Sequence, residues 1–289
     1  MKSICLYSSY FNQASIPYYV RFYLETIAPC FSEIIFITND KDLDEESLYF
    51  LNINNIAILK VKNEGWDFGM WYKAIAQLDT NQYQQIALVN DSCVLFKKPT
   101  QFFEWLNQSK ADVCGVTDSS AIHYHLQSYF LVFNHKAIPE MLAYFSKHQV
   151  LKDVSEVIEI YEVGLCKTLI DKGFKLEACY SSKNYTGEFS PTFYLAEKLL
   201  KDGMPMIKKK ILFHSYRKPE LFTLARMNFN INADYYINLI KQINKEPLIN
   251  FDKVKQDQSS DMNSLDKFVY NIKRVSILNY RKLKGKRHD

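Results

Sequence analysis

The first ninety residues alternate between short apolar runs and segments whose apolar residues recur at helical spacing. The runs have the length and β-branched character of strands that are buried on both faces of a sheet. They cover residues 2–8, 33–38, 55–61 and 86–89. The helical segments between them begin near Pro17, Asp42 and Phe68. Strands that alternate with helices over short connections predict an α/β fold with a mostly parallel, Rossmann-like sheet covered by helices.

Beyond residue 95 the alternation is less regular. Strands are expected at residues 111–117, 125–133, 175–179 and 207–213, and helices at 100–107, 137–147, 153–172 and 219–246. The composition, with 47% apolar and 24% charged residues, excludes a collagen, a coiled coil, a disordered chain and a small disulfide scaffold. The six cysteines are scattered without a C-x-x-C pair, which favours reduced thiols in the cytoplasm.

Polar residues follow every predicted strand of the first half. Ligands of parallel sheets bind outside the carboxyl ends of the strands, so these strand tips are candidate binding residues. The tips are Ser8-Ser9-Tyr10, Thr38-Asn39-Asp40, Asn63-Glu64-Gly65 and Asn90-Asp91-Ser92. We therefore predict a polar ligand pocket at this edge of the sheet.

The segment NEGWDFG, residues 63–69, connects a predicted strand to a predicted helix. Gly65 allows a tight turn, and Asp67 can cap free amides at the start of the helix. From these residues alone, a connecting loop with a helix cap explains the segment as well as a binding site does. The patterns G-x-G-x-x-G and G-x-x-x-x-G-K-[ST] are both absent, so neither a dinucleotide fingerprint nor a phosphate loop is indicated.

Four successive segments resemble blocks of the rhamnan synthesis protein F-like family of bacterial glycosyltransferases. They read NEGWDFGMWYKAI, LVNDSCVLFKKP, HLQSYFLVF and IYEVGLCKTLIDKGF, in the order of the family blocks N-x-G-x-D-x-G, NDS, H-x-Q-S-Y-F and Y-E-x-G-L. The resemblance spans about residues 1–215. It implies a GT-A glycosyltransferase fold with a nucleotide-sugar half over 1–95 and an acceptor half over 96–215. A helical extension over 216–250 and a linker with a basic tail over 251–289 would follow.

The resemblance also implies a donor site at the strand tips. Its residues would be Ser9, Tyr10, Asn39, Asn63, Gly65, Asp67, Asn90 and Ser92. Asp91 would face the donor diphosphate and bind a divalent cation, Mg²⁺ or Mn²⁺, through oxygen ligands. His214 would supply a late metal ligand. The family fold usually has two acids in a D-x-D motif, whereas Asp91 is a single acid, so metal dependence stays open; an Asp-Ser turn is the structural alternative.

In the Y-E-x-G-L block, the resemblance implies that Glu162 is the catalytic base. One carboxylate must remove the proton of the acceptor hydroxyl as the anomeric carbon is attacked in an inverting transfer. Glu156 and Glu159 compete with it in the same segment. A solvated helix face is the alternative role for all three acids.

We predict that His125, Gln127 and Ser128 bind the acceptor. Alternation along a strand places His125 and Gln127 on one polar face, which is typical of a cleft wall that binds sugar hydroxyls. A buried histidine with protein partners is the structural alternative. Further along, the three lysines 208–210 could bind phosphate, but adjacent residues cannot all face one site, which favours a solvated edge strand.

The charge of the chain is concentrated in residues 267–289. This tail has eight Lys or Arg against one acid, a net charge of +7, and the remaining residues have 28 bases and 31 acids, a net charge of −3. Apolar residues interleave with the bases, as in amphipathic helices that bind anionic membranes. Nucleic acid, a partner groove and a disordered end are the alternatives, of which we rank nucleic acid low because the body is acidic.

The expected function is transfer of a sugar from a nucleotide-sugar to a saccharide or lipid-linked saccharide in bacterial surface polysaccharide synthesis, such as O-antigen, capsule or lipopolysaccharide. Rhamnose is the first candidate sugar. No run of about 18 apolar residues occurs and the N-terminal residues resemble a strand more than a signal peptide, so we expect a cytoplasmic protein at the inner face of the membrane. The alternative is a non-catalytic carbohydrate-binding or scaffolding subunit, which the missing D-x-D acid favours.

Overall fold

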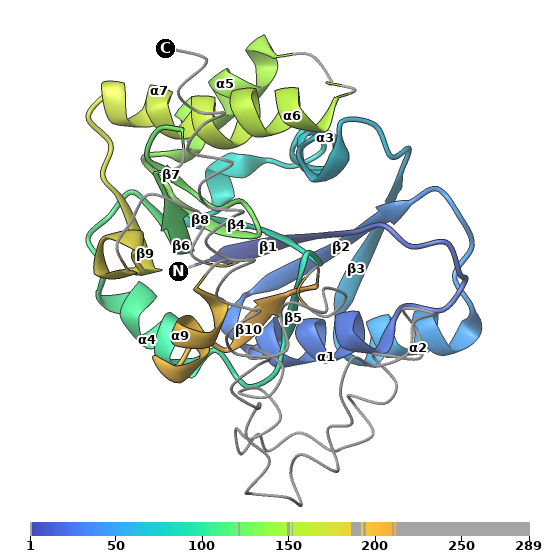
Figure 1. Ribbon diagram of the computed structural model, residues 1–289. Coiled ribbons are helices and arrows are strands. Elements are labelled where there is room, and N and C mark those ends of the chain that lie inside the picture. Colours follow the sequence, from blue (N-terminus) through green and yellow to red (C-terminus); the bar gives the residue numbers. More distant parts are fainter. Residues whose placement is uncertain are drawn as a thin grey trace, which may run out of the picture.

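The computed structural model is a layered α/β protein in which helices lie on both sides of a central sheet (Figure 1). The structure describes residues 2–120, 122–148, 151, 153–185, 192, 195–209 and 211. The predicted helical extension, the linker, the basic tail and His214 therefore lie outside the described residues. Within the described part, no helix is both long and apolar enough to cross a membrane.

The first half of the sheet is parallel, as the sequence predicts. Its strands are β1 (Ser3–Ser9), β2 (Glu33–Asn39), β3 (Ile56–Val61) and β4 (Gln85–Asn90). They run in the order β3-β2-β1-β4, and all three pairs are parallel. Ser8 of β1 pairs with Asn90 of β4, so the polar ends of the two central strands lie side by side.

The second half of the sheet is mixed. β8 (Phe130–Asn134) runs antiparallel between β4 and β6 (Val113–Ser119), and β6 also pairs with β7 (His125–Leu126) and with β9 (Leu176–Tyr180). The single strand predicted over 125–133 is therefore interrupted: both parts pair with β6, but the register shifts between them and the ladder breaks around Ser128. At this break the Ser128 amide donates to the Glu162 carboxylate rather than to a neighbouring strand.

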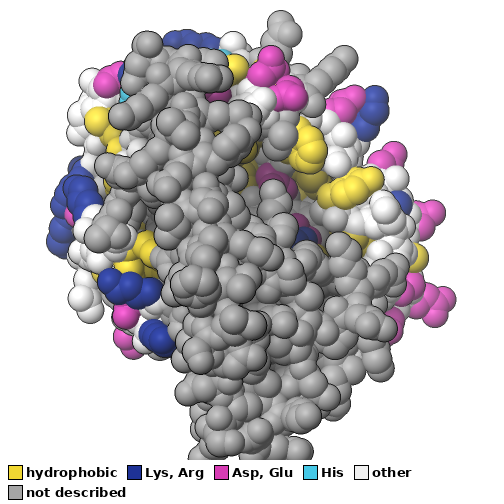
Figure 2. Space-filling model, viewed as in Figure 1, with side chains coloured by type: hydrophobic (Ala, Val, Ile, Leu, Met, Phe, Trp, Pro, Cys, Tyr) yellow, Lys and Arg dark blue, Asp and Glu magenta, His cyan; other side chains and the backbone are white. Residues whose placement is uncertain are grey.

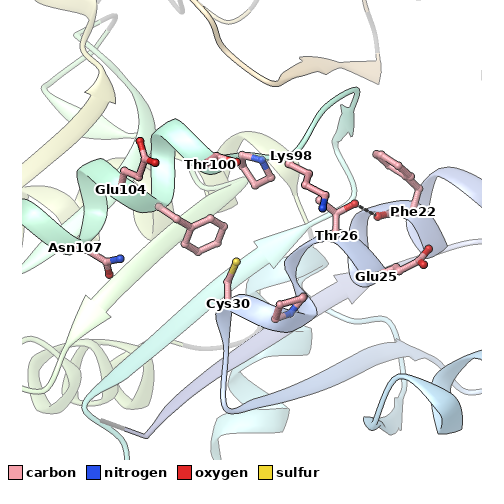
Figure 3. Close-up of a pocket in the computed structure, with 11 residues that line it drawn as sticks. Phe22, Glu25, Thr26, Cys30, Lys98, Thr100, Glu104 and Asn107 are labelled. Carbon is pink, nitrogen blue, oxygen red and sulfur yellow. Dashed lines mark hydrogen bonds between the residues drawn. The ribbon is translucent and has the colours of Figure 1, made fainter. Parts of the chain in front are cut away.

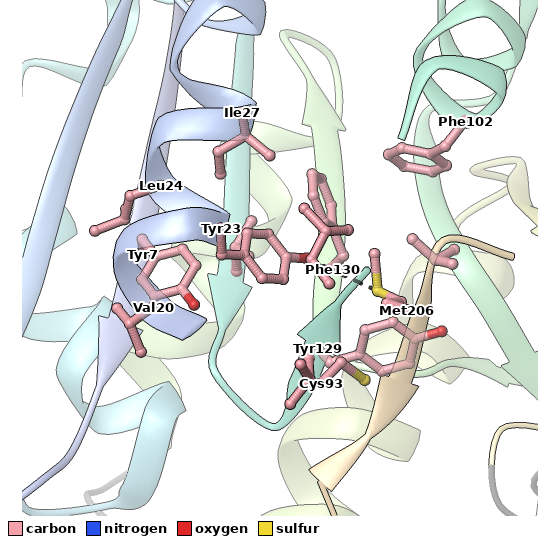
Figure 4. Packing of buried hydrophobic residues seen from close by; sticks show 14 of the residues in the cluster. Tyr7, Val20, Tyr23, Leu24, Ile27, Cys93, Phe102, Tyr129, Phe130 and Met206 are labelled. Atoms are coloured by element: carbon pink, nitrogen blue, oxygen red, sulfur yellow. Dashed lines mark hydrogen bonds between the residues drawn. The ribbon is translucent and has the colours of Figure 1, made fainter. Parts of the chain in front are cut away.

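Helices cover both faces of the sheet. α1 (Tyr18–Ile27) and α4 (Thr100–Gln108) pack in one core, and α3 (Trp66–Ile75), α5 (Ile138–Lys147) and α7 (Leu165–Asp171) pack in the other. α2 (Glu45–Ile53) lies beyond the end of β2 and starts at the N-cap Asp44. The apolar stripe predicted for α1 is buried, and Figure 4 shows Tyr23 of this stripe packed among Tyr7, Phe130 and Met206.

The turn into α3 has the backbone that its glycine predicts. Gly65 is the N-cap residue with a φ of 75°, in the left-handed region that favours glycine. The helix then begins at Trp66, which places Asp67 in the first turn beside the ends of β1 and β4. The fold thus positions Asp67 through one tight turn.

A helix is present where one is predicted over 153–172, but its hydrogen-bonding pattern changes along its length. It consists of α6 (Val154–Glu156), a π-helical segment η3 (Val157–Gly164) and α7. The Tyr144 hydroxyl donates to the Ile160 carbonyl at 2.6 Å, which gives a partner to a backbone group inside the π-helical segment. Gly173 with a φ of 86° follows the end of α7, as predicted for a helix stop.

Two short strands far apart in sequence form a second sheet. β5 (Cys93–Leu95) pairs antiparallel with β10 (Met206–Lys208), immediately after the tip of β4. The remaining elements are η1 (Ala28–Cys30), η2 (Thr80–Gln82), η4 (Ser182–Tyr185) and α9 (Ala196–Lys201). The strand predicted over 207–213 therefore starts one residue earlier and ends at Lys208.

Candidate active site

Two carboxylates lie at the carboxyl ends of the central strands. One is Asp91, which is 9% exposed and follows β4 directly. Its Oδ2 accepts hydrogen bonds from Ser9 Oγ at 3.1 Å and Tyr19 Oη at 2.7 Å, and it pairs with Lys209 Nζ at 2.9 Å. Three donors on a single oxygen fix this carboxylate firmly in one orientation.

The second carboxylate is Asp67 in the first turn of α3. Its Oδ1 accepts from Ser8 Oγ at 3.1 Å, and its Oδ2 accepts from Asn90 Nδ2 at 2.8 Å. Burial, with a smaller contribution from the charge of Asp91, raises the pKa of Asp67 from 3.8 to about 7. Asp67 is therefore largely protonated in the folded protein below neutral pH.

Strand geometry explains why the two acids are held separately. Consecutive residues of a strand point to opposite faces of a sheet, so Ser8 and Ser9 face different layers, as do Asn90 and Asp91. Ser8 and Asn90 bind Asp67 on the α3 side, whereas Ser9 and Asp91 meet Tyr19 on the α1 side. The strand tips thus join both layers of the protein into one polar cluster.

Two lysines from the end of β10 complete this cluster. The Lys209 amide donates to the Ser92 carbonyl at 2.9 Å, and its ammonium reaches Asp91. Lys208 donates to Ser92 Oγ at 3.3 Å and lies 4.6 Å from the centre of the Tyr129 ring. On the face shown in Figure 2, acidic and basic side chains are visible in a hollow near the centre. Among the described strands β10 pairs with β5 alone, so it is the edge strand that the sequence favours, but these two lysines are half-buried and not fully solvated.

The other predicted donor residues differ in their surroundings. Ser92 is half-buried, and its amide donates to Asn90 Oδ1 at 3.0 Å. Tyr10 is 52% exposed, Asn63 is exposed, and Asn39 accepts from the Thr38 hydroxyl at 3.3 Å. Within the described ranges, no hydrogen bond joins these last three predicted residues to either carboxylate. The donor-binding role of Tyr10, Asn63 and Asn39 therefore remains a prediction, and these residues are not part of the polar cluster.

Glu162 lies in the π-helical segment and faces the sheet. Its Oε1 accepts from the Ser128 amide at 2.9 Å, and the side chain is half-buried. The competing acids Glu156 and Glu159 are exposed. The carbonyl of Tyr129, the residue after Ser128, accepts from the Asn90 amide at 3.2 Å. Two hydrogen bonds and one residue of backbone therefore connect Glu162 to the tip of β4.

The predicted acceptor residues have protein partners. His125 is buried, and its Nδ1 lies 2.8 Å from the His123 carbonyl oxygen. Gln127 is also buried, and its Oε1 accepts from the hydroxyls of Thr117 and Thr192. These contacts agree with the structural alternative for both side chains. Ser128 contributes its backbone amide to Glu162.

The residues around Asp91 do not fit a divalent cation. The only acid of the N-D-S segment shares its Oδ2 with an ammonium group, and Asn90 uses its oxygen to accept from Ser92. In the part of the chain that the structure describes, no three His, Cys, Asp or Glu side chains are grouped as a metal site. Mg²⁺ can bind through one or two carboxylates together with substrate phosphates and water, so the feature that argues against a metal here is the Lys209 ammonium on Asp91.

A cavity of about 490 Å³ lies elsewhere, between the C-terminal part of α1 and the start of α4 (Figure 3). Its lining includes Phe22, Thr26, Cys30 and Phe103. Along α1, Thr26 is about 10 Å from Tyr19 at the usual helical rise of about 1.5 Å per residue. The cavity is therefore separate from the polar cluster at the strand tips.

The family match decides what kind of protein this is. The profile of the rhamnan synthesis protein F family matches residues 34–278, most of the chain. The chain belongs to this family. Membership supports a nucleotide-sugar glycosyltransferase, in agreement with the resemblance of the four sequence blocks.

Two curated proteins are similar in sequence to part of this rhamnan synthesis protein F family member. The protein y4gN of Sinorhizobium fredii is 26% identical over 54% of this chain and 43% of its own length. Virulence protein VirA of Vibrio anguillarum is 25% identical over 54% of this chain and 62% of its own length. The chain thus matches less than two thirds of either relative. Among solved structures, 4-diphosphocytidyl-2C-methyl-D-erythritol synthase from Anaerococcus prevotii is 14% identical, covers 62% of this chain and 88% of its own, and has a TM-score of 0.41.

The four family blocks meet in the folded chain. Asp67 of the first block binds Asn90 of the second, and the Asn90 amide binds the Tyr129 carbonyl of the third. The third block also donates through Ser128 to Glu162 of the fourth. Sequence reasoning missed Tyr19, which follows the first strand tip and Pro17. It considered Lys209 as a phosphate ligand but favoured a solvated strand, because only the pairing of β10 with β5 brings this lysine to the cluster.

Proposed function

We propose that this protein is an inverting glycosyltransferase that uses the polar cluster to bind a nucleotide-sugar. The observation that supports this function best is the chain of hydrogen bonds that joins all four family blocks, from Asp67 through Asn90 and Ser128 to Glu162. Residues 1–95 form the donor half and residues 96–215 the acceptor half. The strand tips of the donor half face the nucleotide-sugar, in the usual place for ligands of parallel sheets.

In the proposed reaction, the acceptor oxygen attacks the anomeric carbon of the donor sugar. The Glu162 carboxylate takes the proton of the acceptor hydroxyl as the new bond forms. The bond between the anomeric carbon and the diphosphate oxygen breaks, and the diphosphate leaves with the electron pair. The Ser128 amide holds Glu162 in place by its hydrogen bond to Oε1. Direct displacement inverts the anomeric configuration.

Family membership supports a proposal for the sugar and the acceptor. Rhamnose is the proposed sugar, and a saccharide on a lipid carrier, in the synthesis of a bacterial surface polysaccharide, is the proposed acceptor. The tail over residues 267–289, with its net charge of +7, would hold the enzyme on the anionic inner face of the membrane, where such carriers lie.

The test is sugar transfer by the purified full chain. The protein is incubated with dTDP-rhamnose, UDP-glucose, UDP-N-acetylglucosamine or GDP-mannose and with rhamnose oligosaccharides, and release of nucleoside diphosphate is followed. With the active donor, Glu162→Gln should lower kcat by roughly 10²–10⁴-fold, because Gln keeps the size and an acceptor oxygen but cannot take the proton.

The matched control is Glu159→Gln, which alters an exposed acid of the same segment and should leave the rate unchanged. If no donor releases its nucleotide while an oligosaccharide still binds, the enzyme hypothesis is wrong. That result would favour the non-catalytic carbohydrate-binding subunit. Equal rates for Glu162→Gln and the wild type would remove Glu162 from the mechanism.

A further inference from the structure

We propose that Lys208 and Lys209, rather than a divalent cation, neutralise the diphosphate of the donor. Asp91 is then a positioning residue that anchors Lys209, and not a metal ligand. This inference rests on the proposed function, because it assumes a nucleoside diphosphate at the strand tips. It assigns the ion-binding role to a segment more than a hundred residues beyond the N-D-S block.

Asp91 already has a positively charged partner. Its Oδ2, the atom that accepts from Ser9 and Tyr19, is 2.9 Å from the Lys209 ammonium. A divalent cation on the same carboxylate would lie a few ångströms from this positive charge, and like charges at that separation repel strongly in a partly buried site. The ammonium thus occupies the Oδ2 side of the carboxylate, and a cation bound at Oδ1 would still lie close to its charge.

The pairing of β10 with β5 fixes the backbone of both lysines. Met206 and Ile207 are almost fully buried in β10, and the Phe96 amide donates to the Pro205 carbonyl at 2.8 Å. The Lys209 amide continues this ladder to the Ser92 carbonyl. The backbone of both lysines is therefore fixed beside Ser92, and the hydrogen bonds to Ser92 Oγ and Asp91 then hold the two ammonium groups.

Both lysine side chains are accessible to a ligand. The Lys209 side chain is 27% exposed, and Lys208 is half-buried. Lys208 contacts the neutral Ser92 hydroxyl and the face of the Tyr129 ring, and no carboxylate of the described residues forms an ion pair with it. An anion with several oxygens can accept from Lys208, Lys209 and the Ser92 hydroxyl together. A diphosphate has this shape, and positive groups aimed at it also stabilise it as a leaving group.

The test is calorimetric binding of dTDP, UDP and GDP to the full chain in excess EDTA and in Mg²⁺ or Mn²⁺. We expect at least one diphosphate to bind equally well in EDTA. Lys209→Met should weaken its binding by about tenfold or more, Lys208→Met should do so to a similar degree, and Lys209→Arg should restore most of the affinity. Lys167→Met, which removes an exposed lysine of α7, is the matched control and should bind as the wild type does.

The outcomes separate this inference from the proposed function. Binding that occurs only with Mg²⁺ or Mn²⁺, or that is unchanged in both lysine variants, overturns the inference and leaves the glycosyltransferase proposal standing. Absence of binding to every diphosphate under all conditions overturns both. Asp91→Asn provides a second test. As an anchor of Lys209, Asp91 predicts that the variant and the wild type each bind equally in EDTA and in Mg²⁺, the variant more weakly; a metal ligand predicts that Mg²⁺ strengthens binding to the wild type but not to the variant, which would overturn the inference. Circular dichroism of each variant confirms that it is folded.

Discussion

The acid Asp67 should make the protein less stable as the pH rises. In the folded state, burial and the charge of Asp91 raise the pKa of Asp67 from 3.8 to about 7, while Ser8, Lys209 and Lys208 act in the opposite direction. Between these two values the folded state keeps a proton that the unfolded chain has lost. The free energy of unfolding therefore falls from about pH 4 to about pH 7.

The magnitude follows from the difference in pKa. A difference of about three, at about 1.36 kcal/mol for each, gives an upper bound of about 4 kcal/mol. Because the side chain is only half-buried and water screens part of the charge, we expect about 2 kcal/mol. Asp67→Asn should abolish this loss, since an amide can accept from Asn90 and donate to Ser8 without any ionisation.

The assay is urea unfolding of the wild type and of Asp67→Asn at pH 5 and pH 8. At pH 5 the unfolded chain has already lost this proton, so part of the loss is present there. We expect the variant to gain about 1 kcal/mol relative to the wild type between pH 5 and pH 8. Asp42→Asn is the matched control, because Asp42 is a fully exposed acid in a surface ion pair with Lys60. If Asp67→Asn has the same pH dependence as the wild type, the carboxyl is not perturbed and the reasoning fails.

Two further predictions concern the π-helical segment and the tail. A Cβ at Gly164 would lie 2.5 Å from the Tyr144 hydroxyl, so Gly164→Ala should lower the free energy of unfolding by about 1–3 kcal/mol, and by less in a Tyr144→Phe background. Equal losses in the two backgrounds, measured by urea unfolding, would exclude this contact as the cause. Deletion of residues 267–289 should abolish sedimentation with phosphatidylserine vesicles but not nucleotide binding; unchanged sedimentation would refute membrane docking by the tail.

The parallel half of the fold could be predicted because its signals are local. A short periodic pattern predicts each strand and helix of residues 1–90, and parallel strands bring their carboxyl ends to one edge of the sheet. Ser9, Asn90 and Asp91 were therefore predicted together from the strand tips, and the family resemblance added Asp67. The structure pairs Ser9 with Asp91 and Asn90 with Asp67.

The rest of the site depends on contacts that no local pattern contains. Lys209 reaches Asp91 because β10 pairs with β5, a contact between segments more than a hundred residues apart. The period-2 pattern of residues 125–133 suggested one strand because it does not show that the Ser128 amide bonds to Glu162 instead of to a neighbouring strand. Side chains whose partners lie on distant elements are thus the ones that the sequence misplaces.

The charges of the cluster explain how an anion site can exist without a metal. Asp91 is negative, Lys208 and Lys209 are positive, and Asp67 is mostly neutral below about pH 7 because burial and Asp91 raise its pKa. The formal charge of these four groups is then +1. The burial that makes ionised Asp67 costly therefore also leaves the cluster cationic. A second ionised carboxylate would cancel that charge, so we expect a diphosphate to bind more weakly as the pH rises through about 7.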